Sequence, residues 1–99
     1  MDNQHRKIAG YRELSQHEID LMNAIKAKGE EMDALLNQVS THLEIQAGQA
    51  NAQSRPPDIS GELQRISRAQ PSRWLAIART DIQTGIMAAV RAVAQPTTF

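Results

Sequence analysis

The sequence of 99 residues contains no cysteine, and its aromatic residues are limited to one Trp, one Tyr and one Phe. The lack of cysteine excludes disulfide bonds, thiol nucleophiles and thiolate metal sites. No apolar run approaches the roughly 20 residues that a transmembrane helix requires. The first residues also lack the apolar core of a signal peptide. We therefore expect a cytosolic protein that does not bind a membrane.

The chain has no excess of one charge, because 11 Lys and Arg residues balance 11 Asp and Glu residues. Nonspecific binding of duplex DNA normally needs a basic domain, so duplex DNA is not an expected partner. The charges are nevertheless segregated. Residues 13–47 contain seven acids and two bases, whereas residues 61–99 contain five arginines and two acids. The simplest interpretation is two helices of opposite charge that attract each other.

Motifs for catalysis are also missing. His5, His17 and His42 are too scattered to form a local metal motif. There is no nucleophile-elbow sequence, no metal-hydrolase motif and no glycine-rich loop that would cradle a phosphate. We therefore expect a protein that is not an enzyme and that has no catalytic residues, no cofactor and no metal site.

The residues that are present favour helices. Ser15 and Glu18 form a predicted capping box at the start of a first helix over 15–47, after a lead-in over 1–14. A loop over 48–60 contains a Pro pair, and a second helical segment covers 60–95 with a break near Pro71. We predict an all-α fold with one domain, 1–99. It is a helical hairpin of two long antiparallel helices with a short N-terminal segment.

Apolar residues of the first helix recur every seven residues, as in a coiled coil. They form two rows: Met22, Gly29, Leu36 and Leu43 in one, and Ile25, Met32 and Val39 in the other. Gly29 would suit the close approach of a backbone or a ligand, although a merely tolerated glycine explains it equally well. The second helix is apolar over an arc too wide for one partner helix, with small residues at 78, 85, 89 and 92. Both features favour a homo-oligomer.

A few residues suggest a ligand. Tyr11, the only tyrosine, lies in the lead-in among basic residues, where its ring can stack on a nucleobase. Lys26 flanks the apolar rows of an otherwise acidic helix, at a position that faces an interface. Together with several arginines they could bind a compact anionic nucleotide between subunits. The alternative is that Tyr11 packs the lead-in onto the helices and that Lys26 forms an ordinary interhelical ion pair.

Two blocks of sequence resemble a known family. The first runs from His5 through Gly10-Tyr11-Arg12 to Ser15 and continues to Asn23, and the second runs from Arg73 to Pro96. They are similar to the phage anti-CBASS sponges, which sequester cyclic oligonucleotides, and to the related helical hairpin domain of phage anti-Thoeris sponges. The resemblance implies a homohexamer of helical hairpins that captures immune second messengers without cleaving them, in the cytoplasm of the infected bacterial host.

The resemblance also suggests which residues bind. In this family cyclic dinucleotides bind between paired protomers, and the matching contacts here are Tyr11, which stacks on the base, and Lys26, which pairs with phosphate. Arg12, next to Tyr11 in the same block, is assigned to the same pocket. Some members also hold cyclic trinucleotides on threefold axes. By chemistry and position, the candidates for that pocket are Arg73, Arg79 and Thr80, although Arg73 could equally form a structural ion pair.

Three other functions remain open. A ligand-free structural or regulatory hairpin explains the apolar rows and the charge segregation equally well. A sponge for cyclic ADP-ribose isomers would use the same fold. A phosphodiesterase that destroys the same messengers would require metal ligands or a histidine pair, which the sequence lacks.

Overall fold

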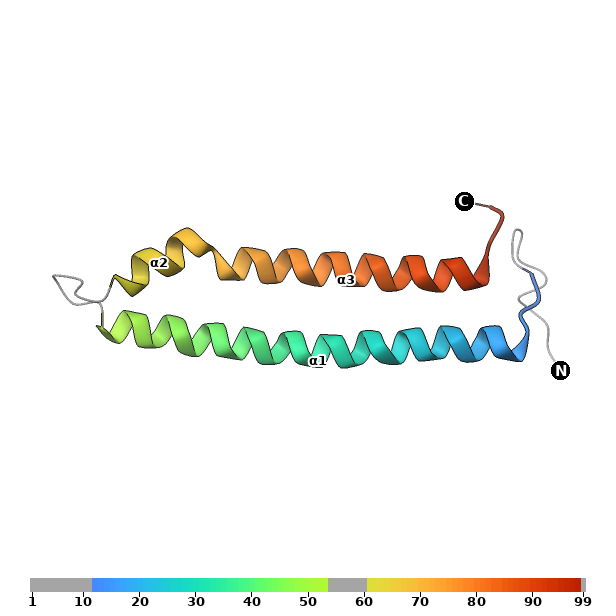
Figure 1. Cartoon of the computed structure of the whole chain (residues 1–99), viewed down its shortest axis with the longest axis horizontal. Helices are drawn as coiled ribbons and strands as arrows, with labels where there is room; N and C mark the ends of the chain where they lie inside the picture. The colour runs from blue at the N-terminus through green and yellow to red at the C-terminus, as the bar shows by residue number, and fades with distance from the viewer. Residues whose placement is uncertain (1–11, 54–60, 99) are drawn as a thin grey trace. The chain divides into compact units, whose positions relative to one another are not determined.

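The computed structural model describes residues 12–53 and 61–98, and these residues form three α-helices and no strand. Helix α1 spans Gln16–Gln53, α2 spans Glu62–Ala69 and α3 spans Pro71–Ala94. The chain runs in one direction through α1 and in the opposite direction through α2 and α3 (Figure 1). The predicted all-α hairpin is therefore confirmed.

The chain divides into two compact units, and each contains part of α1 and part of α3. The described residues of the first unit are 12–31 and 82–98, and those of the second are 32–53 and 61–81. The first unit contains the beginning of α1 and the end of α3. The second unit contains the end of α1, all of α2 and the beginning of α3.

The start of α1 is the predicted capping box. The Glu18 backbone N–H donates to Ser15 Oγ at 3.2 Å, and the Ser15 backbone N–H donates to Glu18 Oε1 at 2.9 Å. The Ile19 N–H then donates to the Ser15 carbonyl at 3.0 Å, which is the first helical bond. Two backbone N–H groups that the helix leaves without partners are thus satisfied by side chains.

The end of α1 lies further along the chain than expected. The sequence predicts a loop over 48–60, but α1 continues to Gln53. Ala50 in this last part is only 4% exposed, and its neighbours are mostly good helix formers. Burial at Ala50 offsets the cost of a glycine at position 48, which is why the helix does not stop there. The rest of the predicted loop lies outside the described residues.

The break between α2 and α3 occurs at Gln70, beside the proline near which the sequence predicts it. Gln70 has left-handed backbone angles, φ 50° and ψ 54°, and its N–H donates to the Ile66 carbonyl at 2.9 Å. Pro71 has no N–H and disfavours helical angles in the residue before it, so α2 has to end here. At the first position of α3 the same proline is well tolerated.

We call α1 one arm of the hairpin, and α2 together with α3 the other arm. Half-buried residues form a stripe along α1 and another along α3. On α1 the stripe contains Met22, Ile25, Gly29, Leu36 and Leu43. On α3 the stripe contains Leu75, Ala78, Ile82, Ile86, Ala89, Val90 and Val93. Gly85 and Ala92, which the sequence pattern placed in the same row, are exposed, because the stripe advances by four residues from Ile82 to Ile86 and leaves them on the outer side.

The stripes do not bury their side chains completely. Among the described residues only Ala50 is buried. Large apolar side chains are at least 37% exposed at eight positions: Ile19, Leu21, Met32, Leu35, Val39, Ile45, Trp74 and Met87. Apolar surface of this extent is typical of a chain that associates with a partner. Among the described helices, none has an apolar stretch long enough to cross a membrane.

Candidate functional site

Arg12, the first described residue, contacts the start of α1 and the end of α3 within the first unit. Its Nη1 donates to Glu18 Oε1 at 3.3 Å, and its Nη2 donates to Glu18 Oε2 and to the Val93 carbonyl oxygen at 2.9 Å. One guanidinium thus joins the lead-in, the first turn of α1 and the last turn of α3. These bonds engage two of the three guanidinium nitrogens.

Glu18 is the centre of this arrangement. Its carboxylate accepts hydrogen bonds from the Arg12 guanidinium and from the Ser15 N–H, and together they lower the pKa of Glu18 to about 2. Both donors stabilise the charged form, and the guanidinium is the larger cause. Glu18 therefore remains ionised, and paired with Arg12, at acidic pH values that protonate an ordinary carboxylate.

Tyr11, the predicted stacking residue, lies outside the described residues. The assignment of Tyr11 to a ligand stays a prediction.

Lys26 lies on α1 in the first unit, and its side chain is exposed. It is on the same side of the helix as Met22 and Gly29, four residues before it and three after it. Within the described part of the chain it makes no hydrogen bond or ion pair. Lys28, two residues further on, pairs instead with Glu31 at 3.2 Å. The assignment of Lys26 to a ligand stays a prediction.

Gly29, one turn beyond Lys26, lies against α3. A Cβ added there would meet three side-chain atoms of Ile86, the nearest being Cγ1 at 3.3 Å. The sequence suggested the close approach of a backbone or a ligand or a merely tolerated glycine, and the group that approaches Gly29 is instead a side chain of the same chain. The two arms of the first unit come together next to Lys26.

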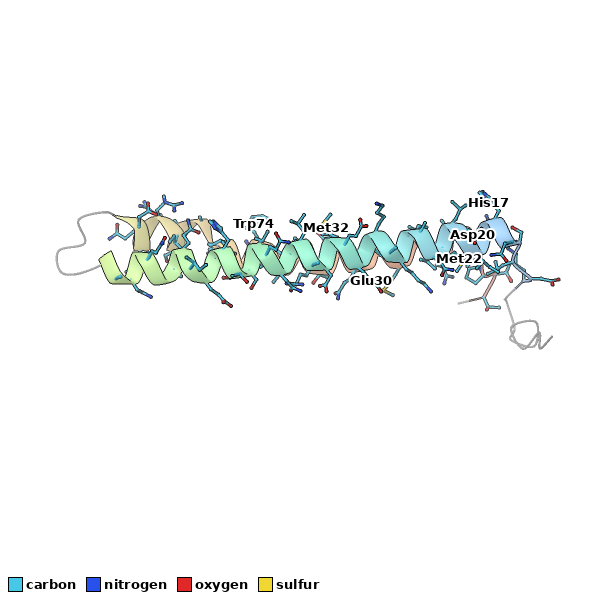
Figure 2. The ribbon with its side chains drawn as sticks, turned by 90° about the horizontal axis from the view of Figure 1, so that it is seen from below. His17, Asp20, Met22, Glu30, Met32 and Trp74 are labelled. Atoms are coloured by element: carbon cyan, nitrogen blue, oxygen red, sulfur yellow. The ribbon has the colours of Figure 1, made fainter. Side chains whose placement is uncertain are left out.

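The candidates for a trinucleotide pocket lie on α3 in the second unit, and they differ in their partners. The Arg73 guanidinium carbon lies 5.2 Å from the centre of the Trp74 ring, and it has no carboxylate partner among the described residues. Trp74 is 58% exposed. In Figure 2 Trp74 and Met32 lie along the same edge of this unit. Arg73 therefore forms a cation–π contact with Trp74, and its role in binding a ligand or in a structural ion pair stays a prediction.

Arg79 is bound internally. Its Nη1 donates to Asp33 Oδ1 at 3.0 Å, and its Nη2 donates to Asn37 Oδ1 at 2.7 Å. Both partners lie on α1, so this contact joins the two arms of the second unit and is one example of the predicted attraction between oppositely charged helices. Thr80 is exposed and already makes an interaction. A role for either residue in binding a ligand stays a prediction.

The sequence did not reveal the partners of Arg12, Arg73 and Arg79. The Val93 carbonyl is 81 residues from Arg12, and Asp33 is 46 residues from Arg79. The contact between Arg12 and Glu18 could have been predicted from the nearby sequence, because a basic residue six positions before a capping-box glutamate can reach its carboxylate. Among the described residues no group of three His, Asp or Glu side chains could hold a metal ion.

Two comparisons with known proteins agree on a family. Residues 4–94 match the family described as Acb2/Tad1, hairpin domain, so that the match covers the lead-in and all three helices. Anti-CBASS protein 2 from Pseudomonas phage JBD67 is 54% identical over 105 aligned residues, which cover 97% of each chain. Both findings agree with the resemblance carried by the two sequence blocks.

Proposed function

This chain belongs to the Acb2/Tad1 hairpin domain family, and from this premise we propose that it is a phage anti-CBASS protein that sequesters cyclic oligonucleotide second messengers. The observation that carries the proposal is the 54% identity to Anti-CBASS protein 2 over nearly the full length of both chains. The protein would act in the cytoplasm of the infected bacterial host, where it would lower the free concentration of the messenger without cleaving it.

The dinucleotide contacts proposed are Tyr11 and Lys26, with Arg12 as a candidate for the same pocket. Lys26 supports the proposal because its ammonium group is exposed and has no counter-ion among the described residues. Pairing it with a phosphate therefore requires no internal bond to be broken. Stacking on the Tyr11 ring would supply affinity for a base regardless of its identity.

The pocket is proposed to lie between two copies of the chain. Arg12 is held at Glu18, and Lys26 lies eight residues further along α1, about 12 Å along the helix axis. The resemblance to the family's pockets between paired protomers supports this placement. A compact cyclic dinucleotide is better enclosed when Tyr11 of one copy and Lys26 of another face each other.

A cyclic trinucleotide pocket is proposed around Arg73, Arg79 and Thr80. Arg73 supports this most directly, because it carries no counter-carboxylate among the described residues and lies over an exposed indole ring. Arg79 would have to share its guanidinium between the ligand and its partners Asp33 and Asn37.

The assembly itself, proposed to be a homohexamer, can be tested through two glycines. A Cβ added at Gly85 or at Gly48 would meet nothing within 4 Å in the single chain. Gly85 lies on the outer face of α3 with the exposed Ala88 and Ala92, where small residues allow a second helix to come close. We expect Gly85→Leu to lower the mass of the assembly measured by light scattering, and Gly48→Leu to leave it unchanged. A monomeric parent protein would contradict the proposal.

The test of the function is isothermal titration with 3′,3′-cGAMP, followed by heat denaturation of the complex and chromatography of the released ligand. Tight binding with the intact nucleotide recovered is the expected result. Recovery of a cleaved product would show a phosphodiesterase. If titration with this ligand, with cyclic trinucleotides and with cyclic ADP-ribose isomers gives no heat of binding, a ligand-free hairpin protein is favoured. Heat with the cyclic ADP-ribose isomers alone would identify a sponge of the anti-Thoeris kind.

A further inference from the structure

Trp74 is the largest apolar side chain that the described part of the chain leaves exposed. It lies on α3 in the second unit, at an edge of that unit, and it is 58% exposed (Figure 2). An indole ring is among the side chains that stabilise a core or an interface most when they are covered. Exposure alone does not identify what covers this ring, but the arginine beside it does indicate the chemistry.

The Arg73 guanidinium lies over the indole and is not neutralised. Its carbon atom is 5.2 Å from the centre of the Trp74 ring, within the range of a cation–π contact. Successive residues of a helix do not face each other, so this contact requires the Arg73 side chain to fold back over the ring. Among the described residues no carboxylate pairs with the guanidinium. Arg73 thus presents a positive charge that an aromatic ring holds in place.

The position of Arg73 is not explained by the stability of α3. Arg73 lies in the first turn of this helix, which contains no acidic residue. A cation is unfavourable there, because the free backbone N–H groups carry partial positive charge. The first turns of α1 and α2 instead contain the acids Glu18 and Glu62. An anion bound to Arg73 would offset this cost, so Arg73 and Trp74 together suit a ligand that is both anionic and aromatic.

We propose that Trp74 is a binding residue of the trinucleotide pocket, where its indole stacks on a base while Arg73 pairs with a phosphate. This inference rests on the proposed function, since it takes a cyclic trinucleotide as the ligand. A nucleotide supplies both an aromatic base and a phosphate, so it satisfies the exposed ring and the unneutralised guanidinium together. With the guanidinium over one face of the indole, the base stacks on the other face.

The other occupant to consider is a second copy of the chain. An apolar surface laid on Trp74 would also cover Arg73, and a buried charge without a partner is costly. The charge therefore favours the nucleotide, and the experiment distinguishes the two occupants.

Fluorescence tests the contact directly, because Trp74 is the only tryptophan and its indole can be excited selectively. In the free protein we expect acrylamide to quench the emission, as it does for an exposed indole. Cyclic triadenylate should also quench the emission, with the same midpoint as a calorimetric titration. The dinucleotide 3′,3′-cGAMP should leave the emission unchanged, because Lys26 lies in the other unit.

Trp74→Leu separates stacking from apolar packing, because leucine keeps an apolar side chain and removes the ring. We expect this variant to bind cyclic triadenylate about 5- to 150-fold more weakly, the range for the loss of one base–aromatic stack. Trp74→Phe should retain most of the affinity. The matched control is Ile45→Ala, which should leave the affinity unchanged, since Ile45 lies in the same unit and is 57% exposed. Light scattering and circular dichroism check that each variant keeps its assembly and its helices.

Several results would overturn the inference. Parental affinity in Trp74→Leu, or heat with cyclic triadenylate and no change in emission, would show that the ring is not a contact. Emission that acrylamide does not quench in the free protein would show that a second copy covers Trp74. Quenching by 3′,3′-cGAMP as well would remove Trp74 from a pocket for trinucleotides. If cyclic triadenylate gives no heat, the proposed trinucleotide pocket itself fails, and the inference fails with it.

Discussion

Replacing Tyr11 and Lys26 together by alanine is expected to weaken the binding of a cyclic dinucleotide by roughly a hundredfold or more. Stacking of an aromatic ring on a base is worth about 1–3 kcal/mol. A hydrogen bond to a charged group contributes about 1.5–3 kcal/mol. The two contacts together should therefore supply a large share of the affinity, and titration calorimetry with 3′,3′-cGAMP measures their loss.

Two control variants identify which property of each residue matters. Tyr11→Phe keeps the ring and removes the hydroxyl, so it should retain most of the affinity if stacking is the contact. Lys28→Ala removes a lysine from the same helix, and Lys28 is already paired with Glu31, so its loss should have little effect. Full affinity in a Tyr11→Ala, Lys26→Ala protein that keeps its helical circular dichroism would show that the ligand binds elsewhere.

The features of the fold that could be predicted from the sequence are those that depend on neighbouring residues. The capping box needs only Ser15 and Glu18, three positions apart, and the structure contains both of its hydrogen bonds. The seven-residue spacing places Met22, Ile25 and Gly29 on one face of α1, and all three are half-buried. These outcomes follow from helix geometry alone.

The features that the sequence did not predict depend on distant residues. The continuation of α1 past Gly48 to Gln53 includes the buried Ala50, and no local pattern shows this burial. The inner stripe of α3 passes through Ile86 and leaves Gly85 outside, because the partner helix selects one side of a wide apolar arc. The pairing of Arg79 with Asp33 likewise requires the two arms to be in register.

In the candidate site, too, the sequence predicted what depends on neighbouring residues and missed what depends on distant ones. Residue type and position identified Tyr11 and Lys26 as suitable for a base and a phosphate. A charged side chain can bind a ligand more easily if it has no ion-pair partner within the chain. The sequence does not show which charged residues have such partners. Lys26 has no partner among the described residues, whereas Arg12 and Arg79, which look equally suitable in the sequence, are bound to carboxylates.

Gly29→Leu should destabilise the first unit, because Ile86 of α3 lies against this residue. A leucine side chain would occupy the space of Ile86, whose nearest atom lies 3.3 Å from the position of an added Cβ. Overpacking of this kind costs about 1–3 kcal/mol, and the gain in helix propensity over glycine returns about 1 kcal/mol. We expect a net loss of up to about 2 kcal/mol, measured as a lower midpoint of thermal unfolding at fixed protein concentration.

Gly48→Ala is the control that separates the effect of crowding on stability from the effect of helix propensity. An added Cβ at Gly48 meets nothing within 4 Å, so Gly48→Ala should gain up to about 1 kcal/mol. That gain would raise the unfolding midpoint by about 4–8 °C. Gly29→Ala should gain clearly less, since Ile86 must move to admit the methyl group. Equal stabilisation by both alanines would show that α1 and α3 are not in close contact at Gly29. In that case the close contact of α1 with Ile86 beside Lys26 would have to be abandoned.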